Sequence, residues 1–251
     1  MAAARAIRDG AVCFVGIGAP SAAANLALRL HAPNAVLVYE SGVIGARPDV
    51  LPLSIGDGEL VEHALAVVSV PEMFAFWLQG GRIDIGFLGA AQVDRFGNLN
   101  STVIGAYARP KTRLPGAGGA PEIAGSARET ILVARHSPRV FVEKLDFVTT
   151  VGHASGGETR AALGFTGGGP SRAITDLGVL EPDPETRELT LTGVHSGISV
   201  EQVRKATGWP LRVASEVQTL PEPSPTELQV LRELQARTQA AHAASAGPRT
   251  A

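Results

Sequence analysis

Cysteine is almost absent from this chain of 251 residues, which contains a single one, Cys13. One cysteine cannot form a disulfide within the chain, and so low a content is typical of a reducing compartment. Cys13 lies in the apolar stretch 11–15. A buried thiol within a strand is therefore expected there, rather than a nucleophile.

Long apolar runs and an excess of one charge are also missing. No uninterrupted apolar run approaches the roughly 20 residues of a membrane helix, and residues 1–10 lack the apolar segment of a secretory signal. The 22 Lys and Arg residues nearly balance the 24 Asp and Glu residues, and no basic run stands out. This balance argues against nucleic acid or an anionic membrane as a partner. We therefore expect a cytoplasmic protein.

Glycine, by contrast, is abundant, with 29 residues that gather in clusters. The cluster at 16–18 lacks the third glycine of a dinucleotide fingerprint. It is either a plain strand-to-helix turn or an anion site at a helix N-terminus. The cluster at 116–119 could direct several backbone N–H groups at one oxygen, as an oxyanion hole does, or could be a flexible surface loop. The cluster at 167–169 is interpreted as a linker.

The first forty residues have the pattern of a β-α-β unit. Residues 11–15 and 35–39 are short apolar runs, and the alanine-rich segment 21–30 between them is typical of a helix. Such a unit predicts two parallel, neighbouring strands. Glu40 would then lie at the carboxyl end of a strand, where open α/β sheets bind their ligands.

Further along, the sequence predicts short elements separated by turns. They are a helical patch at 74–78, a strand at 83–88, a turn at 94–98 leading into 100–104, strands at 131–133, 140–142 and 147–149, and a β-hairpin over 173–194 with a long polar turn. Capping boxes at 199–202 and 224–227 predict two helices. From about His242 onward we expect a frayed tail.

The fold class that this pattern predicts is α/β. We expect one domain over residues 1–220, with an open, mostly parallel sheet flanked by helices and a C-terminal β-hairpin. Residues 221–251 are expected to form a Pro-rich linker, a C-terminal helix and the frayed tail.

Single residues are weak candidates for chemistry. No histidine has a second ligand at helical or hairpin spacing, so no metal site is predicted, and His63, His153 and His195 are expected to be solvated or locally hydrogen-bonded. The serines at positions 21 and 41 lack the flanking residues of a nucleophile elbow. A lone carboxylate such as Glu40 would ordinarily cap a helix or form a salt bridge.

The order of the motifs along the chain is more specific than any one of them. The motifs are Val15–Pro20, Tyr39–Gly42, Ser54–Asp57, Gly89–Thr102, Pro110–Arg113, Gly116–Ala120 and Thr175–Val179. In this order they resemble the β subunits of family I CoA-transferases, of the glutaconate CoA-transferase type. The resemblance extends to about Leu220 and implies the CoA-transferase/NagB-like scaffold.

The resemblance also implies roles for individual residues. Glu40 matches the nucleophilic glutamate of the family, which carries CoA as a glutamyl thioester in a ping-pong exchange between an acyl-CoA and a carboxylic acid. The implied oxyanion and CoA-binding residues are Gly116, Gly118, Gly119 and Gln92, and the implied pocket residues are Gly18, Ser41, Gly42 and Asn98.

The family further implies CoA as substrate and covalent intermediate, with no permanently bound cofactor. It implies a homologous α-type partner subunit, in a hetero-oligomer such as α2β2 or α4β4. Two alternatives stay open. One is a CoA-thioester or ring-opening hydrolase on the same scaffold, although the ring-cleaving branch differs at the glutamate motif. The other is a ligand-binding module without catalysis.

Overall fold

The computed structural model describes residues 1–245 and divides the chain into two compact units. The first unit comprises residues 1–73 and the chain from 223 onward, and the second comprises residues 74–222. The C-terminal helix therefore belongs with the N-terminal segment rather than with the strands that precede it in sequence.

The first unit is built on the predicted β-α-β arrangement. Strand β1 (Val12–Phe14), helix α2 (Ala19–Leu30) and strand β2 (Val36–Val38) follow one another, and β1 pairs with β2 in parallel. Strand β3 (Val43–Ile44) pairs antiparallel with β2, and β4 (Ala66–Val67) pairs antiparallel with β3. The expected parallel pair is thus confirmed.

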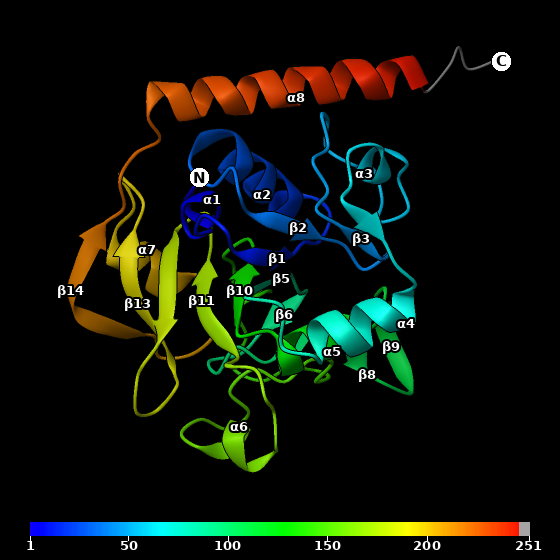
Figure 1. Cartoon of the computed structure of the whole chain (residues 1–251). Helices are drawn as coiled ribbons and strands as arrows, with labels where there is room; N and C mark the ends of the chain where they lie inside the picture. Colours follow the sequence, from blue (N-terminus) through cyan, green and yellow to red (C-terminus); the bar gives the residue numbers. More distant parts are fainter. Residues whose placement is uncertain (246–251) are drawn as a thin grey trace, which may run out of the picture. The chain divides into compact units, whose positions relative to one another are not determined.

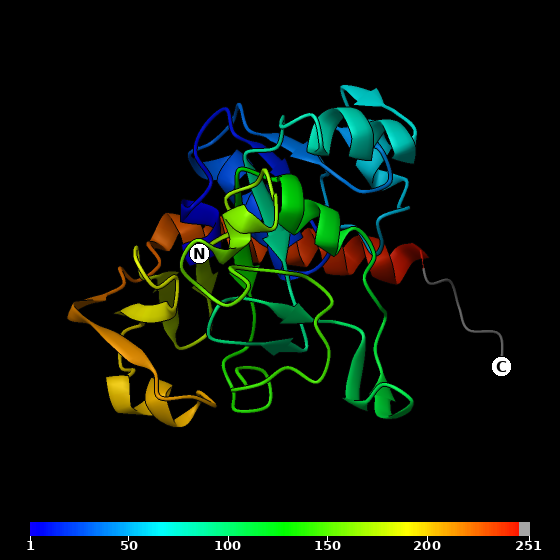
Figure 2. The ribbon, with the colours of Figure 1, turned by 90° about the horizontal axis from the view of Figure 1, so that it is seen from below.

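Helices complete the first unit. The short ones are α1 (Ala2–Arg5), α3 (Glu59–Glu62) and α4 (Val70–Glu72). The long helix α8 (Pro225–Ser245) packs against α2, and its residue Glu227 forms a 2.6 Å ion pair with Arg5. In both views α8, coloured orange to red, is one continuous rod (Figures 1 and 2).

Six of the strands of the second unit pair in the order β5-β10-β11-β12-β13-β14. They are β5 (Ile85–Leu88), β10 (Glu129–Val133), β11 (Pro170–Ile174), β12 (Gly178–Pro182), β13 (Leu189–Val194) and β14 (Arg212–Thr219). The pairs β5/β10, β10/β11 and β13/β14 are parallel, whereas β12 runs antiparallel to both of its neighbours. The α/β class, with a mostly parallel sheet, is confirmed.

Two small ribbons and four helices accompany these strands. The ribbons are β6 (Gln92–Val93) with β7 (Leu99–Asn100), and β8 (Val103–Ala106) with β9 (Arg109–Arg113). The helices are the π-helix η1 (Met73–Leu78), α5 (Ala120–Ser126), α6 (Thr159–Ala162) and α7 (Val200–Lys205). Helix α5 packs on β5 and β10, and a Cβ on Gly86 of β5 would collide with Ile123 of α5.

Two predicted strands are wrong. Residues 140–142 and 147–149 form no strand. Phe141 makes an isolated bridge to Val93, and Thr150, one residue beyond the second predicted strand, makes one to Leu99. Their partners, β6 and β7, are two residues long, so no ladder can propagate. The predicted hairpin corresponds to β12 and β13, and β11 adds a third strand to it.

Both predicted capping boxes are confirmed. Ser199 and Gln202 exchange the two reciprocal hydrogen bonds at the start of α7. Ser224 and Glu227 do the same at the start of α8, where Pro225 is the first helical residue. Helix α8 continues past His242 to Ser245, and the rest of the predicted frayed tail lies outside the described residues.

Candidate active site

Glu40 lies in the tight turn that joins β2 to β3. The backbone N–H of Gly42 donates to the carbonyl of Tyr39 at 3.0 Å, so Glu40 and Ser41 are the two central residues of the turn. The Tyr39 N–H donates to Val43 O at 3.0 Å and continues the pairing of the two strands. Glu40 therefore follows the carboxyl end of a strand that has a parallel neighbour, as the sequence predicts.

Gly42 is the residue that lets this turn close. Its φ is +100°, a conformation that favours glycine. A Cβ at this position would overlap the carbonyl oxygen of Val68, and the Gly42 carbonyl in turn accepts a 2.9 Å hydrogen bond from Val68 N–H. The segment after β4 thus lies directly against the Glu40 turn and leaves no room for a side chain.

The carboxylate of Glu40 has no partner within its surroundings. The residue is half-buried, and no hydrogen bond or ion pair joins its side chain to any of residues 1–245. The adjacent Ser41 Oγ is buried and is likewise without a hydrogen-bond partner in that range. The ordinary roles of a lone carboxylate, a helix cap or a salt bridge, are therefore not performed by Glu40 in this fold.

The glycine cluster at 16–18 lies at the same edge of the first unit as Glu40. Strands β1 and β2 are parallel, and the N–H of Val15, directly after β1, donates at 2.8 Å to the carbonyl of Val38, the last residue of β2. Gly18 is exposed, caps the N-terminus of α2 with φ +85°, and has open space where a Cβ would stand. The predicted strand-to-helix turn is present, and it leaves Gly18 accessible.

A buried hydrogen bond ties the Glu40 turn to helix α2. The hydroxyl of Tyr39 lies 3.2 Å from Ser21 Oγ, and both residues are buried. Burial raises the pKa of Tyr39 to about 12, so the phenol keeps its proton across the physiological range. Ser21 thus has a structural partner, consistent with its exclusion as a nucleophile.

The glycine loop of the second unit is anchored at one end. Gly116, with φ +105°, donates its N–H to Ser101 O at 2.9 Å and accepts from Ser101 Oγ at 2.7 Å. Gly118 follows with φ +49°, and Gly119 caps helix α5. Within residues 1–245, no acceptor takes a hydrogen bond from the N–H groups of Gly118 or Gly119. The loop therefore carries two unused backbone donors.

Gln92 is committed to other protein groups. Its Nε2 donates to Asp146 Oδ2 at 3.0 Å, and its Oε1 accepts from Asn100 Nδ2 at 2.7 Å and from the Asp146 N–H at 3.0 Å. Asn100 in turn accepts from the N–H of Thr102. Through these bonds Gln92 helps to hold residues 100–102, which precede the glycine loop in sequence.

Asn98 is equally committed. Its Nδ2 donates to Asp94 Oδ2 at 2.8 Å and to Ala154 O at 2.7 Å, while its Oδ1 accepts from Gly152 N–H at 2.8 Å. Burial raises the pKa of the Asp94 carboxyl above its ordinary value. Asn98 therefore closes the predicted turn at 94–98 and fastens it to the segment 152–154.

The predicted site residues divide between the two units. Gly18, Glu40, Ser41 and Gly42 belong to the first unit, and Gln92, Asn98, Gly116, Gly118 and Gly119 to the second. Sequence reasoning missed the hydrogen-bonding residues Asn100, Ser101 and Asp146. The first two stand in the signature stretch 89–102, which was the available signal, whereas nothing in the sequence marked Asp146.

The three histidines considered from the sequence all have a local polar partner. His63 is exposed and lies 3.6 Å from Asp49, His153 is bonded to Pro170 O, and His195 to Thr175 O. In the part of the chain that the structure describes, no group of His, Cys, Asp or Glu side chains is arranged to hold a metal ion. No helix among residues 1–245 is long and apolar enough to cross a membrane.

Comparison with known proteins places these features in a family. The model of the coenzyme A transferase family matches residues 1–206. The chain is 58% identical to the B subunit of 3-oxoadipate CoA-transferase from Pseudomonas knackmussii, over 98% of this chain and 95% of the relative. It is 36% identical to the B subunit of glutaconate CoA-transferase from Acidaminococcus fermentans, over 92% of this chain and 88% of that one.

The fold agrees with the sequence comparison. The crystal structure of glutaconate CoA-transferase from Acidaminococcus fermentans superimposes with a TM-score of 0.87 at 35% identity, covering 92% of this chain and 90% of the other. The similarity thus extends well beyond the motifs, through both units.

Proposed function

The chain belongs to the coenzyme A transferase family as a B-type subunit, and we propose that it transfers CoA between two carboxylic acids through a thioester on Glu40. One observation carries the proposal. A half-buried carboxylate stands at the carboxyl edge of a parallel strand pair, in a turn that only glycine can close, and no described residue binds it. A group held so firmly and left unpaired is free to react with a substrate.

The chemistry proceeds by two exchanges at one carboxylate. A glutamate carboxylate is a nucleophile that needs no general base at neutral pH. Glu40 attacks the carbonyl of an acyl-CoA and releases CoA thiolate, which leaves a mixed anhydride. The thiolate then attacks the glutamyl carbonyl, so that the first acid departs and CoA is held as glutamyl-CoA. An incoming acid reverses both steps, and no ATP is consumed.

The N–H groups of Gly118 and Gly119 are the proposed donors to the oxyanions of this reaction. Their lack of an acceptor within residues 1–245 supports this role. A single backbone donor of this kind is worth about 2.7–4 kcal/mol in the transition state. Gln92 and Asn98 have their side-chain groups occupied by the protein, so we assign them the positioning of this region rather than direct contact with CoA.

The proposed acceptor is a dicarboxylic acid. Two of the relatives are named for 3-oxoadipate and glutaconate, which both carry two carboxyl groups. The higher identity, 58%, favours a six-carbon 3-oxo diacid for this chain. With succinyl-CoA as donor, 3-oxoadipate should therefore be used with a higher kcat/KM than acetate or butyrate.

We propose that a homologous α-type subunit completes the enzyme, in an assembly such as α2β2 or α4β4. The relatives are themselves named as B subunits, which supports a second chain. Glutamyl-CoA hydrolyses if water reaches it, so the Glu40 turn must be covered during turnover. The half-exposed position of Glu40 in this chain supplies no such cover by itself.

Steady-state exchange kinetics test the reaction class. The assembled enzyme is given an acyl-CoA with increasing concentrations of acceptor acid. A glutamyl-CoA intermediate predicts parallel double-reciprocal plots, and also exchange of labelled succinate into succinyl-CoA without a second acid. The hydrolase alternative predicts free CoA formation that is independent of acceptor acid. Intersecting plots with no partial exchange would contradict the proposal.

A further inference from the structure

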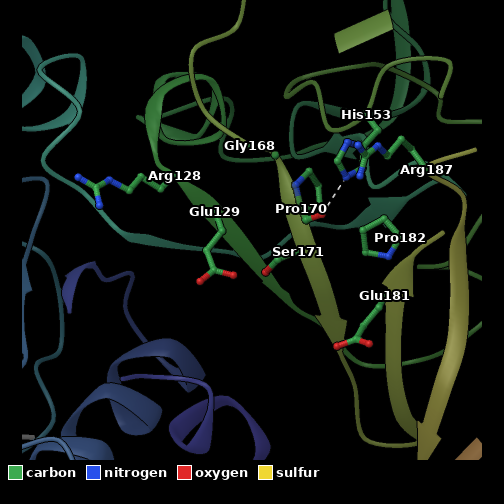
Figure 3. Close-up of a pocket in the computed structure, with 10 residues that line it drawn as sticks. Arg128, Glu129, His153, Gly168, Pro170, Ser171, Glu181, Pro182 and Arg187 are labelled. Carbon is green, nitrogen blue, oxygen red and sulfur yellow. Dashed lines mark hydrogen bonds between the residues drawn. The ribbon is translucent and has the colours of Figure 1, made fainter. Parts of the chain in front are cut away.

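Two adjoining cavities in the second unit lie outside the motifs that carry the family resemblance, and the glycine cluster at 167–169 lies in their walls. The larger has a volume of about 390 Å³ and the smaller about 200 Å³. His153, Gly168 and Arg187 line both of them. The larger cavity is bordered by strands β10, β11 and β12, and in Figure 3 His153 and Arg187 stand together at one end, away from the carboxylates of Glu129 and Glu181.

Arg160, in the wall of the smaller cavity, is a buried cation without a carboxylate. Only 6% of the residue is exposed, and its guanidinium is held by the carbonyl oxygens of Gly167, Val151, Gly152 and Ala124. No acidic group among residues 1–245 forms an ion pair with it, and burial lowers its pKa. Of the five guanidinium donors, one Nη2 hydrogen is left unused. Burying an uncompensated charge is costly unless a counter-charge arrives.

Arg187 is a second cation, and its guanidinium has no hydrogen-bond or ion-pair partner among the described residues. Its side chain is half-buried. Its φ is +62°, a left-handed conformation that glycine would adopt at lower cost. The backbone is held there by the Arg187 N–H bond to Asp183 O at 2.9 Å. A strained arginine at a position suited to glycine indicates that the guanidinium itself is used.

His153 lines the smaller cavity together with the two arginines and supplies a hydrogen-bond acceptor there. Its Nε2 lies 2.8 Å from Pro170 O, and because a carbonyl only accepts, Nε2 carries the proton and Nδ1 the lone pair. Burial, together with the charges of Arg160 and Arg187, lowers the pKa of His153. The residue is 4% exposed. The lowered pKa favours the neutral imidazole, whose Nδ1 can accept a hydrogen bond from a protonated ligand oxygen.

We propose that His153, Arg160 and Arg187 form a binding site for a phosphate group. Two cations attract the anion, and His153 Nδ1 accepts from a P–OH group. The other charged residues of the walls do not cancel this charge. Arg128 and Glu181 are paired with Asp84 and Arg172, at 3.2 and 3.9 Å. Glu129 stands at the far end of the larger cavity, and Glu158 is exposed to solvent.

The phosphate can come from a free anion or from the nucleotide part of CoA. Titration calorimetry on the full chain, co-purified with its partner subunit, tests the site with inorganic phosphate as the probe. Competition by CoA and by dephospho-CoA then separates the sources. If CoA displaces inorganic phosphate but dephospho-CoA does not, the site binds the 3′-phosphate of CoA. If neither compound displaces inorganic phosphate, the site binds a free anion.

Arg187→Gly is the decisive variant, because it removes the guanidinium and relieves the left-handed strain. It should weaken phosphate binding by about tenfold or more, while the unfolding temperature stays equal or rises. Arg135→Gln is the control, because it also removes a guanidinium. The Arg135 side chain is 88% exposed, and its ion pair with Asp176 is long, at 3.9 Å. Absence of phosphate binding in the wild type, or equal affinity in Arg187→Gly, would overturn the proposal. Because the measurement is of binding, it does not depend on Glu40 chemistry.

Discussion

Gly42 determines the geometry of the Glu40 turn more directly than any other residue. Alanine at this position combines a strained φ of +100° with an overlap on Val68 O. We expect Gly42→Ala to lower the free energy of unfolding by about 1–3 kcal/mol and to reduce turnover in the surviving folded enzyme. Urea unfolding followed by an activity assay measures both effects.

Gly58→Ala is the control for this substitution. Gly58 has φ −58° and open space around a Cβ, so alanine should change stability by no more than about 0.5 kcal/mol. A Gly42→Ala variant as stable and as active as this control would show that the turn tolerates a side chain and that its closure is not required.

His136 makes the second unit sensitive to acid. Its Nδ1 and Nε2 lie 3.2 and 3.0 Å from the hydroxyls of Thr175 and Thr207, and its ring stacks on Phe141 with centroids 4.0 Å apart. Burial lowers the pKa of His136 from 6.5 to about 4. The unfolded chain therefore binds the proton more tightly than the folded one. The neutral His136 ring therefore makes its full contribution to the free energy of unfolding above pH 6.5. This contribution, on the order of 3 kcal/mol, is lost as the pH falls towards 4.

The difference in unfolding free energy between wild type and His136→Asn isolates this effect. We expect the wild-type advantage to shrink steadily between pH 6.5 and pH 4, whereas above pH 6.5 it should be constant. An advantage that does not change with pH over this interval would mean that His136 titrates alike in the folded and unfolded chain.

At the scale of elements, the glycine loop depends on its anchor at Ser101. The Ser101 hydroxyl donates to Gly116 O, and the Ser101 N–H donates to Thr149 Oγ1 at 2.9 Å. Ser101→Ala should lower the free energy of unfolding by about 0.5–1.5 kcal/mol. It should lower kcat about tenfold or more, because the N–H groups of Gly118 and Gly119 are then no longer held in position to donate to the oxyanion. Thr112→Ala, on the exposed strand β9, should alter neither. An equal kcat in the two variants would show that the glycine loop takes no part in the reaction.

The elements that were predictable from sequence are those governed by neighbours in sequence. The β-α-β unit follows from apolar periodicity, and the starts of α7 and α8 follow from capping boxes spanning four residues. The strands at 140–142 and 147–149 failed because strand formation also needs a long partner, and β6 and β7 are too short to provide one.

Distant contacts explain what could not be predicted at the site. Glu40 was predicted as the nucleophile from its motif, but the requirement for glycine at position 42 comes from Val68, which lies on another segment. Gln92 was expected to contact CoA, yet its amide is held by Asp146, 54 residues away. The left-handed Arg187 is set by the turn after β12 rather than by any residue pattern.

At the scale of the whole molecule, the surface beside the Glu40 turn indicates that the chain does not act alone. Leu65, directly before β4, and Val67, in β4, are 77% and 61% exposed, and the N–H of the next residue, Val68, donates to the carbonyl of Gly42. Exposed apolar side chains gathered in one place are typical of a surface covered by a partner. We expect the purified single chain to show no transferase activity and to gain it on co-expression with an α-type subunit. Full activity of the isolated chain would refute this expectation.

The most direct test of the whole account is to trap CoA on Glu40. The assembled enzyme is incubated with an acyl-CoA but no acceptor acid, treated with borohydride, digested and analysed by peptide mass spectrometry. A thioester is reduced to an alcohol whereas a free carboxylate is not, so the peptide containing Glu40 should change mass only when acyl-CoA was present. Glu40→Gln should abolish both the modification and CoA exchange, because the amide is neutral and far less nucleophilic. A modification on the partner chain, or wild-type exchange in Glu40→Gln, would contradict the account.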